Sequence, residues 1–433
     1  MKALLIYGLM IFIIPLAFFS PFAGLISYLA VAYLRPHQWA YIPDTRISMF
    51  VAMATLLGYL LFEVTRRFPR IIPNALLVLL WLQLLISTFA SFNPTESRPK
   101  MIEVTKVFVI SLLMTALADS GKRVRQLYLG TAVILGALAV RSFARAIYGG
   151  AENRSYGPGG MFEDNNDYAL LLVMALPIIY YAAKAESTRL WRWGLYFCAL
   201  ATFFTVFVTR SRGGFVGLCV VMFMLAIRTK YKVTGAIFAP LAILLVLAFA
   251  PDVITERFRT IREDGREDRS AQQRLRAWNV CFEIMRDHPF TGVGFRNLMA
   301  VYGNYEDEAD ARVAHNSFLQ MGAEGGIPAM LLLVGLIALS YFRLWRTRTI
   351  LRARAPDSPL IYYSHGLQIA LIGYCVSGFF VSRQDLELLY EIVALATTMR
   401  MLAHQAEQLA QNEIIVESNR VTPPPFGAAP VNA

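Results

Sequence analysis

Charged side chains are scarce in this sequence. Aspartate, glutamate, lysine and arginine make up 16% of its 433 residues, whereas 56% are hydrophobic. A soluble domain carries about a quarter charged residues, so the composition excludes a soluble globular protein. Apolar runs recur along the whole chain, and each is long enough to cross a bilayer. The sequence therefore predicts an all-α polytopic membrane protein.

Three further absences narrow the class. Alternating strands of about ten residues are missing, which excludes an outer-membrane barrel. Of only four cysteines, three lie in apolar runs and Cys281 lies in a loop, so no disulfide framework is predicted. The net charge of +11 belongs to no soluble basic domain, which excludes nucleic acid as a partner. The predicted partner of the chain is the lipid bilayer.

The loops alternate in charge along the chain. Basic loops stand at 63–70, 119–125, 184–192, 228–232 and 343–354. The positive-inside rule makes them cytoplasmic. The intervening loops then face outward, at 35–45, 93–100, 141–165, 209–214, 250–315 and 382–385. This gives about 12 transmembrane helices, with both termini cytoplasmic, if the first segment (3–34) crosses once, and thirteen if its break near Pro15 and Pro21 makes a hairpin.

Four regions follow from this topology. Residues 1–249 hold the N-terminal transmembrane helices, and residues 250–315 form one large, partly helical outer loop. Residues 316–404 hold the C-terminal transmembrane helices. The tail, 405–433, is polar and then proline-rich, a composition typical of a disordered segment.

The stretch TRSRGG, residues 209–214, places Arg210 and Arg212 outside, against the charge rule. Arginines at such a boundary can snorkel to the headgroups. Two of them in a short turn beside Gly213 and Gly214 favour a function instead, because a charge near the membrane is costly. The two glycines are expected to leave room for an anionic group to approach the backbone.

The outer loop contains ten arginines and no lysine, a usage that suits phosphate oxygens, although most of these arginines are explained by pairing with nearby acids. Within it, 270–289 reads as an amphipathic helix on the membrane surface or on the transmembrane core. Its expected apolar face consists of Ala271, Leu275, Trp278, Phe282 and Met285. Arg274 lies roughly 60° from the centre of that face and Arg276 roughly 140°, so Arg274 is the candidate ligand contact.

Of the five histidines, His37, His288 and His315 face outward. His315 stands where the chain re-enters the membrane, and either a boundary histidine among capping residues or a catalytic base fits this place. Asn316 or Ser317 is the expected N-cap. The Gly325, Gly326 and Pro328 that follow (AEGGIP) are expected to open the first turns to a substrate.

Two other outward segments carry weaker signals. Asn165, Asn166 and Asp167 are interpreted as N-caps of the next helix, and this interpretation is favoured over hydrogen bonding to a sugar. The acidic run at 306–310 is interpreted as solvated surface rather than a cation site. No metal and no cofactor is therefore predicted. Negative charge that develops on a phosphate group would then be stabilised by arginines.

Four stretches in order resemble the bacterial O-antigen ligases and O-antigen polymerases. They are TRSRGG (209–214), SAQQRLRAW (270–278), HPFTGVGFRNL (288–298) and AHNSFLQMGAEGGIP (314–328). YLRPHQWAYIP (33–43) and MFEDNNDYAL (161–170) also resemble the O-glycosylation ligases associated with exosortase systems.

The resemblance implies an inverting, metal-independent glycosyltransferase of the bacterial inner membrane. Such enzymes move a glycan from undecaprenyl diphosphate, on the periplasmic side, to lipid A–core, a protein or another glycan. The matching positions make His315 the base and place Arg212 and Arg274 on the diphosphate. Arg210 adds a second cation beside the family position, and Gln273 stands where a glycine is common. The alternatives are a polymerase or protein ligase of the same superfamily, and a transporter or flippase, which the lack of an internal repeat disfavours.

Overall fold

The computed structural model describes residues 2–39, 46–63, 71–149, 157–228, 267–306 and 311–421. Within these ranges the chain is helical and has no strand, which confirms the all-α prediction. The long helices are α1 (Lys2–Phe19), α2 (Pro21–Leu34), α4 (Ile47–Phe62), α5 (Ile72–Phe89), α6 (Pro94–Leu117), α7 (Gly121–Tyr148), α8 (Asn165–Ala185), α9 (Arg189–Val208), α10 (Arg212–Ile227), α13 (Glu267–Asp287), α15 (Ser317–Arg354), α16 (Leu360–Gly378) and α17 (Glu387–Val421). Short turns of helix are α3 (Pro36–Trp39), η1 (Gly160–Phe162), α14 (Leu298–Val301) and η2 (Tyr302–Asn304).

Five of the described helices are long and apolar enough to cross a membrane by themselves: α5, α7, α8, α9 and α15. Three shorter apolar helices accompany them, Ile6–Phe19, Ile47–Phe62 and Arg212–Ile227. The count of about 12 spans stays a prediction. One of its members, the segment 233–249, lies outside the described residues.

The first apolar segment is two helices. α1 ends at Phe19 and α2 begins at Pro21, whose ring cannot donate a backbone hydrogen bond to the preceding turn. The two helices approach closely, since a Cβ on Gly24 would lie 3.0 Å from Ala17 Cα. α4 packs against both of them.

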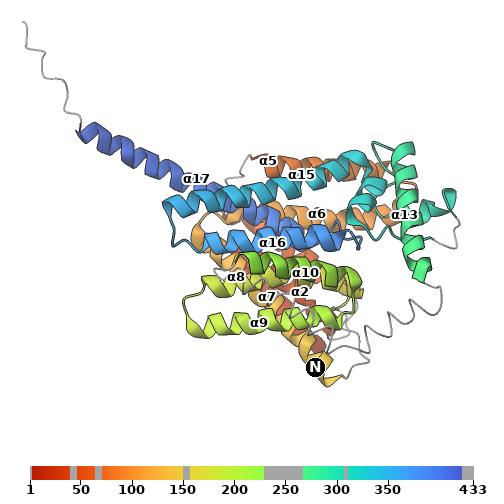
Figure 1. Ribbon diagram of the computed structural model, residues 1–433, viewed down its shortest axis with the longest axis horizontal. Helices are drawn as coiled ribbons and strands as arrows, with labels where there is room; N and C mark the ends of the chain where they lie inside the picture. The colour runs from red at the N-terminus through yellow and green to blue at the C-terminus, as the bar shows by residue number, and fades with distance from the viewer. Residues whose placement is uncertain are drawn as a thin grey trace, which may run out of the picture.

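α8 is the central helix of the bundle (Figure 1). Nearly every residue from Asp167 to Ala183 is buried, and α7, α9, α10 and α16 pack around it. A helix that is apolar on all sides belongs in such an interior position. Its first turn is therefore held in place, and the loops around it contact a fixed helix end.

α15 is interrupted near its start. Gly326 has φ 83° and ψ 166°, a conformation that suits only glycine, and Pro328 follows. The carbonyls of Ala323 and Glu324 accept hydrogen bonds from the N–H groups of Val293 (3.0 Å) and Gly294 (3.1 Å). The expectation that this break is open to substrate is wrong, because the chain's own backbone occupies it.

α5 closes the other side of the break. Gln83 Nε2 donates to Gly325 O (2.9 Å) and Phe290 O (2.6 Å). Ser87 Oγ donates to Glu324 O (2.6 Å). Buried backbone groups must find partners inside the protein, and here two other segments supply them. The break thus joins α5, the 289–294 segment and α15.

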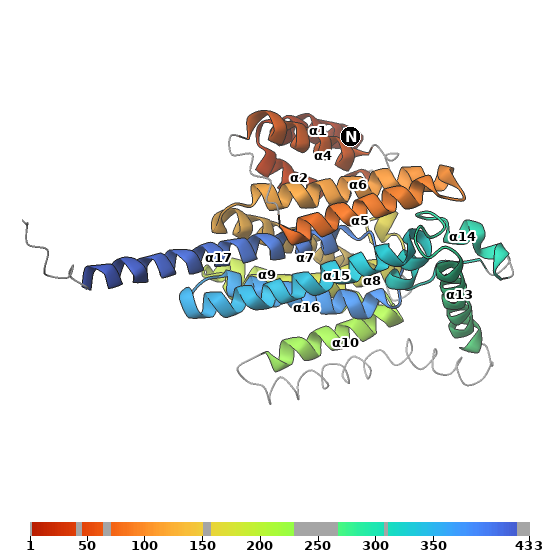
Figure 2. The same ribbon diagram turned by 90° about the horizontal axis from the view of Figure 1, so that it is seen from above.

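α13 lies across one end of the bundle, roughly perpendicular to its helices (Figures 1 and 2). It rests on the transmembrane core through α15. The expected apolar face is wrong at Leu275 and Phe282, which are each 55% exposed, and correct at Met285, which is buried. The rest of the buried row is Ala277, Val280, Cys281 and Ile284. The helix carries two apolar stripes, and close packing on α15 selects the one with smaller side chains.

The described parts of the loops at 93–100, 209–214, 250–315 and 382–385, which are expected on one side, lie at one end of the bundle, here named the His315 end. Phe92 N–H donates to Val293 O (3.1 Å) and joins two of these loops. At the opposite end, Arg125 pairs with Glu186 at 2.6 Å and joins two basic loops. This agrees with the alternation of charge, while the side of the membrane that each end faces stays a prediction.

The helix α17 continues to Val421 and extends away from the bundle (Figures 1 and 2). Residues 405–421 are therefore helical, and the expectation of disorder from 405 onward is wrong for them. The physical reason is composition, because this stretch is polar but rich in glutamine, glutamate and alanine, which favour helix. Residues 422–433 lie outside the described residues.

We predict that Gly58→Ala destabilises the packing of α1 on α4. A methyl group there would overlap the carbonyl oxygen of Phe18, which is backbone and cannot turn away. Overpacking of this kind costs about 1–3 kcal/mol. Thermal unfolding of the purified protein in detergent measures the loss. The control is Gly335→Ala, where no atom lies within 4 Å, and equal melting of the two variants would contradict the prediction.

Candidate functional site

The TRSRGG turn joins α9 to α10 and is held by the start of α8. Ser211 Oγ accepts the N–H of Gly214 (3.1 Å) and donates to Asn166 Oδ1 (2.7 Å). Asn165 Nδ2 donates to Thr209 O (2.8 Å). The turn is therefore braced on both sides of Arg210.

The N-cap of α8 is none of the three residues expected in this role, Asn165, Asn166 and Asp167. Asp164 is the N-cap of α8, and its Oδ1 accepts the N–H groups of Asn166 (2.8 Å) and Asp167 (3.3 Å). The two asparagine side chains are thereby free to brace the turn, and the Asp167 carboxylate to pair elsewhere.

Gly213 and Gly214 do not provide room for a ligand. Both are buried, and a Cβ on them would lie 2.6 Å from Phe380 Cβ and 2.5 Å from Ala169 Cβ, respectively. The glycines instead allow α10 to approach α8 and the end of α16. Arg212 is the first residue of α10 and is exposed, so its side chain remains available at the helix end.

Arg210 is half-buried and adopts φ 55°. Its N–H donates to Phe207 O at 2.9 Å. Positive φ is uncommon outside glycine and costs of order 1–3 kcal/mol. The described non-glycine residues with positive φ are all basic: Arg35, Arg46, Arg210, Arg296 and His315. Each belongs to, or borders, a loop expected at the His315 end, so backbone strain is concentrated there.

His315 is presented between two fixed neighbours. It has φ 48°, whereas Ala314 and Asn316 are fully buried. Ala314 N–H donates to Gln320 Oε1, and Ala314 O accepts from Trp278 Nε1, both at 2.9 Å. Asn316 is the N-cap of α15, which decides between the two expected caps. These contacts force the turn that leaves the imidazole half-exposed.

The predicted site residues influence one another electrostatically. Burial lowers the pKa of His315, the guanidinium groups of Arg274 and Arg312 lower it further, and Asp164 opposes them. Burial and the charge of Arg212 lower the pKa of Arg274. The structure therefore brings Arg212, Arg274 and His315 together. Three arginines beside one carboxylate make a region suited to an anion, next to a neutral imidazole.

Arg312 is a member of this cluster that the sequence analysis did not single out. Arg312 Nη1 donates to Gln273 Oε1 at 2.5 Å. Gln273 is the residue that departs from the common glycine of the resembling family, and its side chain holds the segment before His315 against α13. The sequence shows that both residues are present. It does not show their contact, because they are 39 positions apart in the chain.

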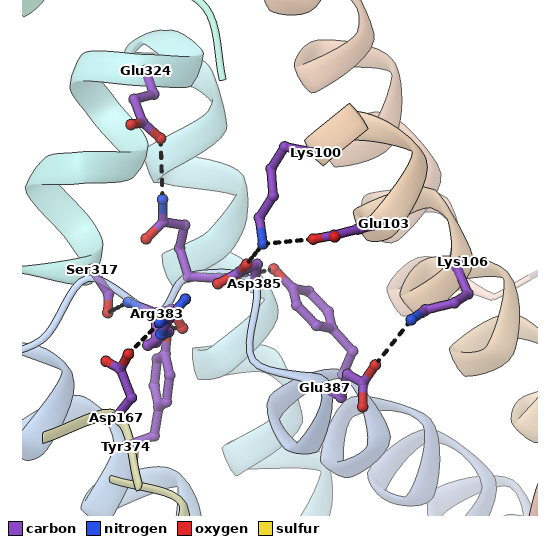
Figure 3. Close-up of polar contacts among 12 residues, drawn as sticks. Lys100, Glu103, Lys106, Asp167, Ser317, Glu324, Tyr374, Arg383, Asp385 and Glu387 are labelled. Atoms are coloured by element: carbon purple, nitrogen blue, oxygen red, sulfur yellow. Dashed lines mark hydrogen bonds and ion pairs between the residues drawn. The ribbon is translucent and has the colours of Figure 1, made fainter. Parts of the chain in front are cut away.

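The sequence also did not predict a buried chain of ion pairs that reaches Ser317, two residues after His315 (Figure 3). Arg383 pairs with Asp167 of α8, and its backbone N–H donates to Ser317 Oγ at 2.9 Å. Asp385 pairs with Lys100 of α6. The only sequence signal was a four-residue outward loop, SRQD at 382–385, carrying both charges.

This chain connects three helices, α6, α8 and α15, with the 382–385 loop. Although burial acts in the opposite direction, Lys100 and Arg383 lower the pKa of Asp385 to about 2, so the carboxylate stays ionised at neutral pH. Gln384 Nε2 adds a bond to Glu324 Oε2 at 3.3 Å. The pairs fix the first turns of α8 and α15. The start of α8 is hydrogen-bonded to the TRSRGG turn, and His315 directly precedes the N-cap of α15.

Histidine, cysteine, aspartate and glutamate do not form a group of three suited to a metal ion anywhere in the described ranges. The acidic run at 306–310 falls outside them except for Glu306.

We predict that Asp167→Asn lowers the free energy of unfolding by about 3–5 kcal/mol, because it breaks a buried ion pair with the Arg383 guanidinium. The double variant Asp167→Asn/Arg383→Gln should recover part of this loss. Chemical unfolding in detergent measures both. As a control, Asp119→Asn removes a pair with Arg123 whose carboxylate is 54% exposed, and it should cost less than about 1 kcal/mol. Equal costs for the two single variants would contradict the prediction.

Comparison with known families agrees with this arrangement. Residues 197–334 match the family model described as O-Antigen ligase, a range that spans the TRSRGG turn, α13 and His315. Residues 1–187 match a family of unknown function (DUF5935). No curated protein matches the chain. The four ordered stretches and the match over residues 197–334 together support membership of the O-antigen ligase superfamily.

Proposed function

We propose that the protein is a ligase-type glycosyltransferase that moves a glycan from undecaprenyl diphosphate to lipid A–core. The reaction takes place at the His315 end, facing the periplasm from the inner membrane. The observation that carries the proposal is one neutral imidazole beside a cluster of arginines at the end of an apolar helical bundle.

The donor diphosphate binds to Arg212 and Arg274, with Arg210 as a further cation at the same turn. Negative charge grows on the diphosphate as it leaves, and fixed guanidinium groups stabilise this charge most when it is fully developed. The bracing of the TRSRGG turn by Asn165 and Asn166 supports the role, because it holds the arginines before the donor arrives.

His315 acts as the base. The acceptor hydroxyl oxygen attacks the anomeric carbon as the bond to the diphosphate oxygen breaks, and the imidazole accepts the hydroxyl proton. A single displacement of this kind inverts the anomeric configuration. The lowered pKa of His315 supports the role, because the imidazole is neutral and ready to accept a proton at pH 7.

The lipid part of the donor has a matching surface. Leu275 and Phe282 on α13 and Phe290 beyond it are 55%, 55% and 75% exposed. These apolar side chains are suited to the edge of the bilayer, where an amphipathic helix rests with its apolar side in the membrane. Their position supports a substrate that reaches the arginines from the lipid.

We predict that His315→Ala lowers kcat for glycan transfer by about 10²–10⁴-fold, the usual contribution of a general base. The assay reconstitutes the protein with undecaprenyl-diphosphate glycan and lipid A–core, and a chelator should leave the rate unchanged. His288→Ala is the control, since His288 lies at the same end but packs against Phe92. Full activity of His315→Ala would refute the proposed base. Chain elongation without transfer to lipid A–core would indicate a polymerase, and lipid movement without transfer would indicate a transporter.

We predict opposite pH shifts from two charge-removing variants near His315. Arg312→Gln removes a cation that lowers the His315 pKa, so the acidic limb of kcat/KM should move to higher pH. Asp164→Asn removes the opposing anion, so the limb should move to lower pH, and asparagine still caps α8. The pH profile of each variant measures the limb. Shifts in the same direction for both variants would contradict the assignment.

A further inference from the structure

A second cationic cluster lies at the opposite end of the bundle from His315. Its arginines come from two helices: Arg228 ends α10, and Arg348 and Arg352 lie in the last turns of α15. All three approach His365, near the start of α16. Tyr181 of α8 stacks on the imidazole ring, with ring centroids 5.4 Å apart.

The contacts within this cluster cannot all be favourable. Arg228 Nη1 and Arg348 Nη1 lie 3.1 and 3.5 Å from His365 Nδ1, and Arg352 Nη2 lies 3.2 Å from Nε2. Guanidinium groups only donate hydrogen bonds, and a neutral imidazole has one nitrogen that accepts and one that donates. In either tautomer a ring N–H therefore faces a guanidinium donor, and an acceptor between them would relieve this conflict.

The positive charge of the cluster is also not balanced by a described carboxylate. Besides the imidazole, Arg228 and Arg348 share one neutral acceptor, Gln368 Oε1. The nearby Glu186 is used by Arg125 at 2.6 Å. Arg348 is only 8% exposed, and a buried cation is costly unless an anion pairs with it.

We propose that Arg228, Arg348 and Arg352 bind a phosphate oxyanion, and that His365 donates its ring N–H to the same group. The planar guanidinium fork matches phosphate oxygens. The site is separate from the proposed donor site, since Arg348 lies roughly 45 Å along α15 from its start at Ser317. The oxyanion comes either from an anionic phospholipid headgroup or from phosphate in solution.

The experiment measures binding to the full-length protein in nanodiscs and detergent. Native mass spectrometry counts bound phosphatidylglycerol against phosphatidylcholine, and isothermal titration with inorganic phosphate tests the soluble source. Saturable retention of phosphatidylglycerol alone assigns the site to a headgroup, and saturable phosphate binding assigns it to the free anion. Either result supports the proposal, and binding of neither anion overturns it.

The test variants are Arg352→Gln and Arg228→Gln, and each should weaken binding by about tenfold or more, as expected for a lost charged hydrogen bond. Arg352 is exposed, so its replacement leaves the packed core intact. The matched control is Arg346→Gln, which removes an exposed arginine from the same end of α15. Equal weakening by the control would mean that general surface charge attracts the anion, and it would overturn the site.

Discussion

The break in α15 is the constraint on which the rest of the molecule depends. A helix that loses its regular hydrogen bonds inside a membrane bundle must find other partners for its carbonyl groups. Val293, Gly294 and Ser87 supply those partners. The same bonds attach the outer segment 289–294 to the bundle, and through it α13. The carbonyl groups of Ala323 and Glu324, two turns into α15, therefore help to set the position of Arg274 relative to His315.

Strain and charge pairing are complementary at this end of the bundle. Arg210 and His315 adopt left-handed backbone conformations, which a loosely held loop would abandon. Their neighbours are held by caps and by side-chain bonds from α8 and α13. Beneath them, the pair of Arg383 and Asp167 ties the loop after α16 to the central helix. A pre-formed cationic surface needs no rearrangement when charge develops on a bound anion such as the proposed diphosphate.

Composition and periodicity predicted the helical class and the loops that share an end, and the family resemblance added the group of Arg212, Arg274 and His315. These features follow from local pattern and from residue type. The pair of Arg383 and Asp167 could not be predicted, because it joins residues 216 positions apart. The buried face of α13 was misjudged since two apolar stripes compete on it and only the partner surface decides. Gly213 and Gly214 were assigned to a ligand because sequence alone does not show which atoms fill the space beside a glycine.

The attachment of α13 places a limit on how this part of the chain can change during evolution. Arg312 holds Gln273, Trp278 reaches Ala314, and the row from Ala277 to Ile284 is buried. An inserted or deleted residue between Gln273 and Trp278 would rotate one of these contacts by about 100° relative to the others. A substitution at the exposed Leu275 leaves these three contacts in register. The length of the segment is therefore more constrained than its sequence.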